Sequence, residues 1–203
     1  MAGVRGQGRK FDLEDILEKA MFVFWRHGYD GTSVSTLTRE MGIGAPSLYA
    51  AFGSKEGLFL AVVEHYNSGW GGFMQRVFDE EERASVLIRR LLYEAADAYA
   101  HVDCPGGCLI ISSAIRVSDT SQQVADRLRE LRNANIDRLE ARIGADVEAG
   151  ILPAGLDARA VAEFLGAIVQ GMSHRARDGA TVATLRTVAG MAWDSVRVLL
   201  GET

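Results

Sequence analysis

The chain has 203 residues, of which 48% are hydrophobic and 24% charged, so it can bury a sizeable core as one large domain or two small ones. Its net charge of −5 argues against wholesale coating of nucleic acid and would repel an anionic membrane surface. No run of eighteen apolar residues occurs and the first residues lack a secretory signal, so we expect a cytoplasmic protein outside the membrane. Two cysteines are too few for a disulfide framework.

The charge is unevenly distributed along the chain. Residues 1–60 contain seven basic and seven acidic residues, whereas residues 61–203 hold the whole excess of negative charge. Contact with a polyanion must therefore depend on the local placement of cations in the first sixty residues. Residues 1–10 are predicted to form a flexible basic arm, with Arg5, Arg9 and Lys10 as its cations.

Apolar residues recur at intervals of three and four almost throughout, which predicts an all-α fold of about nine helices. The first helix should begin at the capping residue Asp12 and stop at Gly28. A short second helix should follow a cap at Thr32 or Ser33 and end near Met41.

Glycine and proline separate the helices that follow. A third short helix is predicted for about residues 46–51, because Pro46 is tolerated in a first helical turn. The fourth should begin after the capping Ser54 and run past His65 toward Phe78, with a bend or break at the glycines of residues 69–72. Further helices are predicted at about residues 83–102, 107–117, 119–149, 157–178 and 181–200.

The stretch GIGAPSLYAAFGSK, residues 42–55, joins the second and third predicted helices. Its Gly-Ile-Gly turn is typical of a helix-turn-helix, in which Ile43 fills the gap between the helices, while Leu48 and Phe52 hold the third helix against the second. The outward face of the third helix is then small enough to enter a DNA major groove about 12 Å wide. That face consists of Ala45, Pro46, Ser47, Tyr49 and Ala50.

Phosphate contacts are predicted on both sides of the third helix. The free amides that begin the second helix lie beside Thr32 and Ser33, and those that begin the fourth lie beside Lys55, so each helix presents its positive dipole end. The basic arm would enter a neighbouring minor groove. Spacing alone leaves open a helical hairpin without a DNA function, a solvated Lys55 and a solubilising N-terminal tail.

The segment GYDGTSVSTLTREMGIGAPSLYAAFGSKEGLF, residues 28–59, resembles the N-terminal signature of the TetR family of bacterial transcriptional regulators. The shared features are a Gly-aromatic pair, Thr-Ser, a Gly-Ile turn, Leu-Tyr, a phenylalanine and Ser-Lys-Glu before an apolar residue, and the likeness covers residues 11–60. The resemblance implies an all-α homodimer with a helix-turn-helix DNA-binding domain at residues 11–56 and a ligand-sensing and dimerisation domain at residues 57–203. It also implies binding to a palindromic operator, by default as a repressor, and release of the DNA by a small ligand.

The same resemblance gives DNA-contacting roles to residues already named: Ser47 and Tyr49 for the groove, and Lys55 with Thr32 or Ser33 for phosphates. Two positions depart from many relatives. Ala51 stands where a histidine is common, which removes a possible phosphate donor, and Thr38 stands where an alanine is common, which adds a hydroxyl near the turn. Operator sequence and affinity therefore do not carry over from the family.

The last two predicted helices carry more apolar residues than one buried stripe needs. Glycine and alanine among them permit close approach, so we predict that the two helices pack against their twins in a four-helix dimer interface. A single monomeric core is the alternative. The predicted interface residues are Phe164, Leu165, Ile168, Leu185, Val188, Trp193 and Val196.

Aromatic and soft side chains gather in the fourth to eighth predicted helices, where we expect a cavity for a small apolar or aromatic molecule. The alternative for each of them is ordinary core packing. Phe78 belongs to this group, and the polar candidates for orienting the ligand are His65, Ser112 and His174. The predicted ligand-binding residues are Trp70, Phe73, Met74, Tyr93, Tyr99, Cys108, Ile111, Ser112, Met172 and His174.

Cys104 and Cys108 flank a Pro-Gly-Gly turn that would allow their sulfurs to approach within disulfide range. One interpretation is a buried apolar Cys108 and an incidental loop thiol at Cys104. A second is a thiol switch that senses oxidants or electrophiles, because a cysteine near a helix N-terminus has a lowered pKa. A third is a metal site that includes His101 and Asp103, for which the loop is hardly long enough.

Enzyme signatures are absent from the sequence. The C-x-x-x-C spacing in an all-α setting argues against a thiol oxidoreductase, which needs C-x-x-C in a strand-helix context. No Walker-type phosphate loop, H-E-x-x-H pair or nucleophile elbow occurs. We therefore expect a DNA-binding regulator that is not an enzyme and holds no cofactor or metal. Its expected partners are a double-stranded DNA operator, a small-molecule effector and a second copy of the chain.

Overall fold

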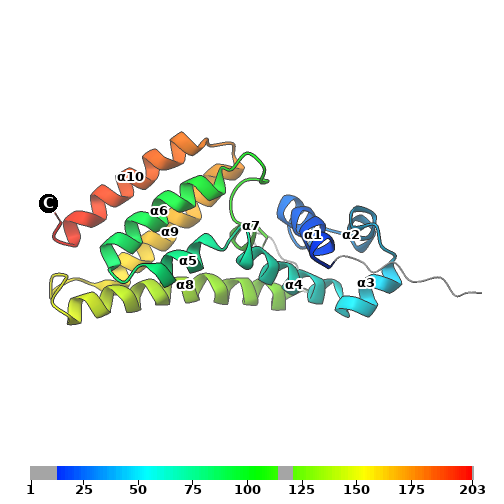
Figure 1. Ribbon diagram of the computed structural model, residues 1–203, viewed down its shortest axis with the longest axis horizontal. Coiled ribbons are helices and arrows are strands. Elements are labelled where there is room, and N and C mark those ends of the chain that lie inside the picture. Colours follow the sequence, from blue (N-terminus) through cyan, green and yellow to red (C-terminus); the bar gives the residue numbers. More distant parts are fainter. Residues whose placement is uncertain (1–12, 114–120, 203) are drawn as a thin grey trace, which may run out of the picture.

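The computed structural model describes residues 13–113 and 121–202, and these form ten helices without strands (Figure 1). The all-α prediction is confirmed. The helices are α1 (Leu13–His27), α2 (Val34–Met41), α3 (Ala45–Phe52), α4 (Lys55–Ser68), α5 (Phe73–Glu80), α6 (Ala84–Tyr99), α7 (Leu109–Ser112), α8 (Gln122–Glu148), α9 (Ala158–Arg177) and α10 (Val182–Leu199).

One helix more than predicted is present, because the chain breaks where glycines follow α4. Helix α4 ends at Ser68 and α5 begins at Phe73. The backbone at Gly71 lies so close to the ring of Tyr66 that a Cβ atom there would overlap it. The bend predicted at residues 69–72 is thus a complete interruption that turns α5 away from α4.

Helices α1, α2 and α3 form a small bundle at one end of the elongated molecule (Figure 1). Ser33 caps α2 by accepting a hydrogen bond of 3.0 Å from the amide of Thr36. Gly42 ends α2 in a left-handed conformation with φ of 69°, which a side chain would strain, and the chain turns directly into α3. Ile43 and Leu48 are buried between the helices, as predicted for a helix-turn-helix.

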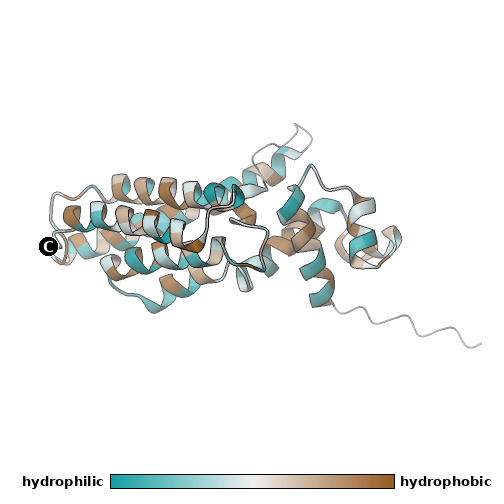
Figure 2. Ribbon diagram, turned by 90° about the horizontal axis from the view of Figure 1, so that it is seen from above, coloured by the Kyte–Doolittle hydropathy of each residue, from teal (hydrophilic) through white to brown (hydrophobic). Residues whose placement is uncertain are grey.

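The remaining helices form the larger end of the molecule. Helix α10 packs along α6, and α8 packs along α9, while α5 covers part of α6. Figure 2 shows hydrophobic and hydrophilic residues alternating along these helices, as expected for amphipathic helices around a shared core. A buried carboxylate also joins two of them, since Asp146 of α8 accepts a hydrogen bond of 2.7 Å from the first amide of α6, at Ala84.

Helix α4 belongs to both ends of the molecule. Near its start, the ring of Phe59 meets Phe24 of α1 edge to face, with ring centroids 4.9 Å apart. Near its end, Tyr66 meets Trp25 of α1 in the same way at 5.1 Å. Such aromatic pairs contribute stability beyond the area that they bury. The whole length of α4 is therefore packed against α1.

Some sequence predictions fall outside the described residues. These are the basic arm with Arg5, Arg9 and Lys10, the cap at Asp12, and the later part of the helix predicted at residues 107–117. Among the helices of residues 13–113 and 121–202, none has the length and apolar character needed to span a membrane.

The free energy of unfolding tests the packing of the helix-turn-helix. Leu48 is fully buried, so Leu48→Ala should lower the free energy of unfolding by about 2–5 kcal/mol through lost burial and a residual cavity. Leu13 is 55% exposed, and Leu13→Ala should change the free energy of unfolding by less than about 1 kcal/mol. Urea denaturation followed by circular dichroism measures both, and equal losses would contradict the packing described for α3.

Candidate DNA-binding surface and ligand cavity

Helix α3 presents the outward face that the sequence predicted. Ser47 and Pro46 are exposed, and Tyr49 is 48% exposed, whereas Leu48 between them has no exposed surface. The helix is only eight residues long and is joined to α4 by Gly53 and Ser54 alone. Because Leu48 fixes its inner side and the short link fixes its end, α3 holds its polar side chains at a defined angle.

Hydroxyl groups gather at the start of α2, on the same bundle. The exposed Ser33 lies 2.8 Å from the hydroxyl of Ser35 and 2.9 Å from that of Thr36. Ser35 and Thr36 were missed in the sequence analysis, although the run TSVST carries the signal. Thr32 is placed differently from the prediction, because it is only 1% exposed and donates its hydroxyl to the carbonyl of Gly28 at 2.7 Å. Its side chain holds the turn and does not face solvent.

Lys55 opens α4 directly after the link from α3. Its Nζ atom lies 4.2 Å from the centre of the Tyr29 ring, a cation–π contact that fixes the position of the ammonium. Burial lowers the pKa of Lys55, and the nearby Asp30 carboxylate opposes that effect. Ser54 caps α4 through a bond of 3.0 Å to the amide of Gly57, so the positive end of this helix lies beside the same cation.

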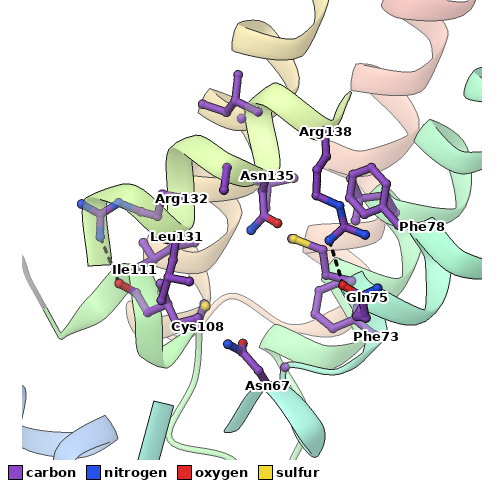
Figure 3. A pocket seen from close by; sticks show the side chains of 18 of the residues that line it. Asn67, Phe73, Gln75, Phe78, Cys108, Ile111, Leu131, Arg132, Asn135 and Arg138 are labelled. Atoms are coloured by element: carbon purple, nitrogen blue, oxygen red, sulfur yellow. Dashed lines mark hydrogen bonds between the residues drawn. The ribbon is translucent and has the colours of Figure 1, made fainter. Parts of the chain in front are cut away.

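A cavity of about 560 Å³ lies in the larger end of the molecule, between α4, α5, α8 and α9 (Figure 3). Much of its wall is apolar, with Phe78, Leu131 and Val169 among the lining residues. Its volume suits a drug-sized organic molecule. Five of the residues predicted to bind a ligand line this cavity: Phe73, Met74, Tyr99, Cys108 and Ile111.

The other five predicted ligand residues do not line the cavity, and each has a different place. Trp70 donates its indole N–H to Glu18 at 3.3 Å and packs against α1. Tyr93 points toward α10, where its hydroxyl approaches Gly190. Met172 is core with 1% exposure, His174 is exposed to solvent, and Ser112 is partly buried away from the cavity. His65 also serves α1, through Glu18 at 3.0 Å.

Polar side chains that the sequence analysis missed take their place at the cavity. Asn67 of α4 and Asn135 of α8 point their amides toward its middle from opposite sides (Figure 3). Arg138 of α8 lies 4.0 Å above the Phe78 ring and donates to Gln75 of α5 at 2.9 Å. A signal existed in the sequence, since residues 131, 135, 138 and 139 share one helical face that mixes apolar and polar side chains.

Two family models match this chain. The first, "Bacterial regulatory proteins, tetR family", matches residues 16–62, and the second, "Tetracyclin repressor-like, C-terminal domain", matches residues 86–189. The first match contains α2, α3 and most of α4, and the second contains most of the cavity wall. The chain belongs to the TetR family. The family resemblance of the sequence is thereby confirmed, and membership makes the chain a helix-turn-helix transcriptional regulator and not an enzyme.

Named relatives agree with this membership. The chain is 36% identical over 188 residues to the "HTH-type transcriptional repressor ComR" of Escherichia coli (strain K12), which covers 92% of this chain and 89% of that protein. It is 27% identical to the "HTH-type transcriptional repressor BdcR" of the same strain over 98% of this chain and 96% of that protein. One similar solved structure is that of the TetR family regulator CifR, a cysteine mutant in complex with 26 bp double-strand operator DNA. It superposes on this chain with a TM-score of 0.87 and is 34% identical in sequence, and the match covers 93% of this chain and 99% of that one.

Both cysteines of this TetR-family chain are free thiols, and their setting differs from the predicted switch. Burial raises the pKa of Cys108, although a hydrogen bond with Tyr66 opposes this, and burial also raises the pKa of Cys104. The lowered pKa on which the switch hypothesis relied is thus wrong for this structure. Cys108 still lines the cavity. Among the residues that the structure describes, no three His, Cys, Asp or Glu side chains come together as metal ligands.

The predicted dimer residues separate into two groups on α9 and α10. Leu165, Leu185 and Val196 have at most 1% exposure and fill the core of their own chain, so they cannot form an intermolecular surface as placed here. Ile168, Val188 and Trp193 are partly buried, and Phe164 is 41% exposed. Exposed apolar residues also lie on α10: Leu199, which belongs to the apolar set of this helix in the sequence, and Met191 and Val198, which the prediction missed.

Helix α9 is connected directly to the DNA-binding end of the molecule. Arg177, its last residue, donates to the carbonyl oxygen of Trp25 at 2.7 Å and to that of Arg26 at 3.2 Å. These carbonyls belong to the last turn of α1, where carbonyl groups have no hydrogen-bond partner within the helix. The cavity-lining helix α9 and the first helix of the DNA-binding bundle are therefore joined without passing through α4.

The raised pKa of Cys108 predicts slow alkylation. A raised pKa lowers the thiolate fraction at neutral pH, so Cys108 should react with iodoacetamide more slowly than free glutathione does, and its rate should rise with pH past the ordinary thiol pKa of about 8.5. Intact-mass spectrometry over time measures the rate. The variant Cys104→Ser isolates Cys108, and Cys108→Ser isolates Cys104. Alkylation of Cys108 at neutral pH faster than glutathione would restore the switch hypothesis.

Proposed function

We propose that this protein is a transcriptional repressor that binds a palindromic operator as a homodimer and is released by a small, largely apolar ligand. The observation that carries the proposal is the exposed Ser47 and Tyr49 face of α3, fixed by the buried Leu48 and by the two-residue link to α4. ComR and BdcR are described as repressors, and CifR was crystallised with operator DNA, which supports the same role here. A cytoplasmic location belongs to this proposal.

The proposed DNA contacts divide between bases and phosphates. Ser47 and Tyr49 supply hydrogen bonds to base edges, while Ala45 and Pro46 offer small apolar contacts to thymine methyl groups. Ser33 and Lys55, each at the positive end of a helix, contact phosphates on either side of the groove. The arm with Arg5, Arg9 and Lys10 adds contacts in the adjacent minor groove.

The homodimer is proposed to form through the outer faces of α9 and α10. On α10, Met191 and Val198 lie seven residues apart on one face and are 68% and 67% exposed. On α9, Phe164 and Gly171 share a face in the same way, and a side chain added at Gly171 would meet nothing within 4 Å of its own chain. Exposed apolar side chains and a bare backbone suit close helix packing across a two-fold axis.

Ligand release is proposed to act through α4. Tyr66 and Asn67 near its end line the cavity, whereas Lys55 at its start holds a proposed phosphate contact. A ligand that changes the tilt of α4 therefore changes the distance between the two copies of α3. Operator half-sites require a spacing of about 34 Å or a multiple of it, so a small change lowers affinity. The thiol-switch alternative has less support, because both thiols have raised pKa values.

Two substitutions test the DNA contacts. Tyr49→Ala should weaken operator binding by about tenfold or more through lost base contacts. Lys55→Ala should make the dependence of the binding constant on salt concentration less steep, by the amount that corresponds to about one phosphate contact per protomer. A palindromic duplex is first selected from random sequences with the wild-type dimer, and fluorescence anisotropy at several salt concentrations then gives both quantities. Val102→Ala, at an 89% exposed position of the larger domain, is the control. Wild-type binding by Tyr49→Ala would remove α3 as the reading element.

A substitution that introduces a charge tests the proposed dimer surface. Met191→Glu should convert the dimer to a monomer, because it places a carboxylate at the centre of an apolar contact. Arg89→Glu on α6, also exposed but outside the proposed face, should leave the dimer intact. Sedimentation velocity distinguishes the two states, and circular dichroism verifies that each variant is folded. A dimer that survives Met191→Glu unchanged would place the interface elsewhere.

A further inference from the structure

The charges that line the cavity are few and predominantly positive. Among the described residues that line it, only three have charged side chains: Glu64, which is exposed, and Arg132 and Arg138 of α8. Arg132 lies at the α7 end, where it donates to the carbonyl oxygen of Ile110 at 3.1 Å (Figure 3). The remaining polar groups are amides and hydroxyls. An apolar cavity with this balance favours a ligand that carries negative charge.

Arg138 is the cation that is best placed to receive such a ligand. Its guanidinium lies 4.0 Å above the Phe78 ring, which fixes the plane of the group, and one N–H is bonded to Gln75. Within residues 13–113 and 121–202 no carboxylate pairs with it. Arg159, which is more exposed than Arg138, shows the contrast, since it binds Asp137, Glu140 and Glu163. A guanidinium has five N–H donors, so most of those of Arg138 remain for a ligand.

Two amide side chains accompany Arg138. Asn135 lies on the same helix three residues earlier, and Asn67 faces it from α4; both point toward the middle of the cavity (Figure 3). Neither side chain makes a hydrogen bond with another described residue, so their N–H groups are available as donors. Carboxylate oxygens accept several hydrogen bonds at once, and guanidinium groups bind them in a two-pronged geometry.

The size and walls of the cavity limit the anion. About 560 Å³ is enough for an organic molecule, and aromatic and aliphatic side chains such as Phe73, Tyr99 and Leu131 would surround its body. A phosphate ester would carry about two negative charges and several acceptors. Arg132, whose guanidinium also has no carboxylate partner among the described residues, is directed to the Ile110 carbonyl at the α7 end, so Arg138 and two amides are the donors at this place, which are few for a phosphate. A single carboxylate on an apolar body matches the donors and the walls together.

We propose that the ligand of this cavity is an amphipathic organic acid, whose carboxylate is bound by Arg138 with Asn135 and whose aromatic or aliphatic body lies against the apolar wall. This inference rests on the proposed ligand-controlled release, and it names the chemical class of the ligand. It differs from the sequence prediction, which assigned orientation of an apolar ligand to His65, Ser112 and His174. None of these three residues lines the cavity.

Matched acids and amides test the class of ligand. The probes are phenylalkanoates with three to six carbons in the chain and octanoate, each paired with its primary amide, which has nearly the same shape and no charge. Isothermal titration calorimetry with the full-length protein at neutral pH measures binding. At least one acid should bind about tenfold or more tightly than its amide, as expected for a charge-assisted, two-pronged contact. Equal binding of acid and amide in every pair, or no binding of any acid, would overturn the proposal.

Substitution of Arg138 tests the residue. Arg138→Gln should remove the preference for the acid and leave binding of the amide unchanged, whereas Arg138→Lys should keep part of the preference. Arg127→Gln is the control, because Arg127 lies on the same helix, pairs with Glu130 and does not line the cavity. Thermal melts show whether each variant is folded. If Arg138 serves only to join α8 to α5, Arg138→Gln will lower the melting temperature while the acid preference persists, and the proposal is then wrong.

The outcome is separable from the proposed function. If a neutral amide binds in the cavity and releases operator DNA as well as its acid does, ligand-controlled release stands and the acid proposal fails. If an acid binds through Arg138 but the operator complex is unaffected in anisotropy, the ligand class stands and ligand-controlled release fails.

Discussion

The packing of α4 against α1 is the constraint on which the rest of the molecule depends. Phe59 and Tyr66, two turns apart on α4, meet Phe24 and Trp25 of α1 edge to face. Beyond them, Glu18 of α1 binds His65 and the indole of Trp70. These contacts extend over most of α4, so we expect α4 and α1 to move together. On the proposed ligand-driven release, a displacement at the cavity end of α4 would move α1 and, through the two-residue link, α3 as well.

Arg177 restricts the movement of the DNA-binding bundle further than its attachment to α4 does. Its two hydrogen bonds join the end of α9 to the last turn of α1, so the bundle is attached to the larger domain at a second point. A displacement of α1 relative to α9 would stretch these bonds. The proposed ligand-driven movement would then either carry the end of α9 along or exchange the two bonds for water. Since α9 also contributes Val169 and Gln170 to the cavity wall, the first route connects the ligand to α1 from both sides.

Local signals made the DNA-binding end predictable from sequence. Caps, turns and short-range packing act between residues that are close in the chain. The cap at Ser54 and the packing of Leu48 occur as predicted, Ser33 is the cap of the two candidates, and Gly42 makes the predicted turn in a left-handed conformation. Thr32 was assigned wrongly because a hydroxyl beside a cap can face either solvent or a neighbouring carbonyl, and spacing does not decide between them. The cavity was predicted only in part. Which face of α8 meets α4 and α5 depends on contacts over more than sixty residues, so Asn135 and Arg138 were missed, while Trp70 and Tyr93 were assigned to the wrong surroundings.

The proposed ligand class and the proposed movement meet at Gln75. This residue of α5 accepts a hydrogen bond from Arg138 of α8, and α5 follows α4 after a break of only four residues. A carboxylate bound as proposed uses N–H groups of Arg138 that Gln75 leaves free, and it is a stronger acceptor than the Gln75 amide. The same guanidinium would then bind both the ligand and α5, while Arg142 of α8 keeps the end of α5 in place through the carbonyl oxygens of Phe78 and Glu81. A neutral molecule of the same shape fills the cavity without drawing on the charge of Arg138. On this proposal, a shift of the guanidinium toward an acid is passed to Gln75 and so to the segment that follows α4, which makes Arg138 the residue where recognition and release coincide.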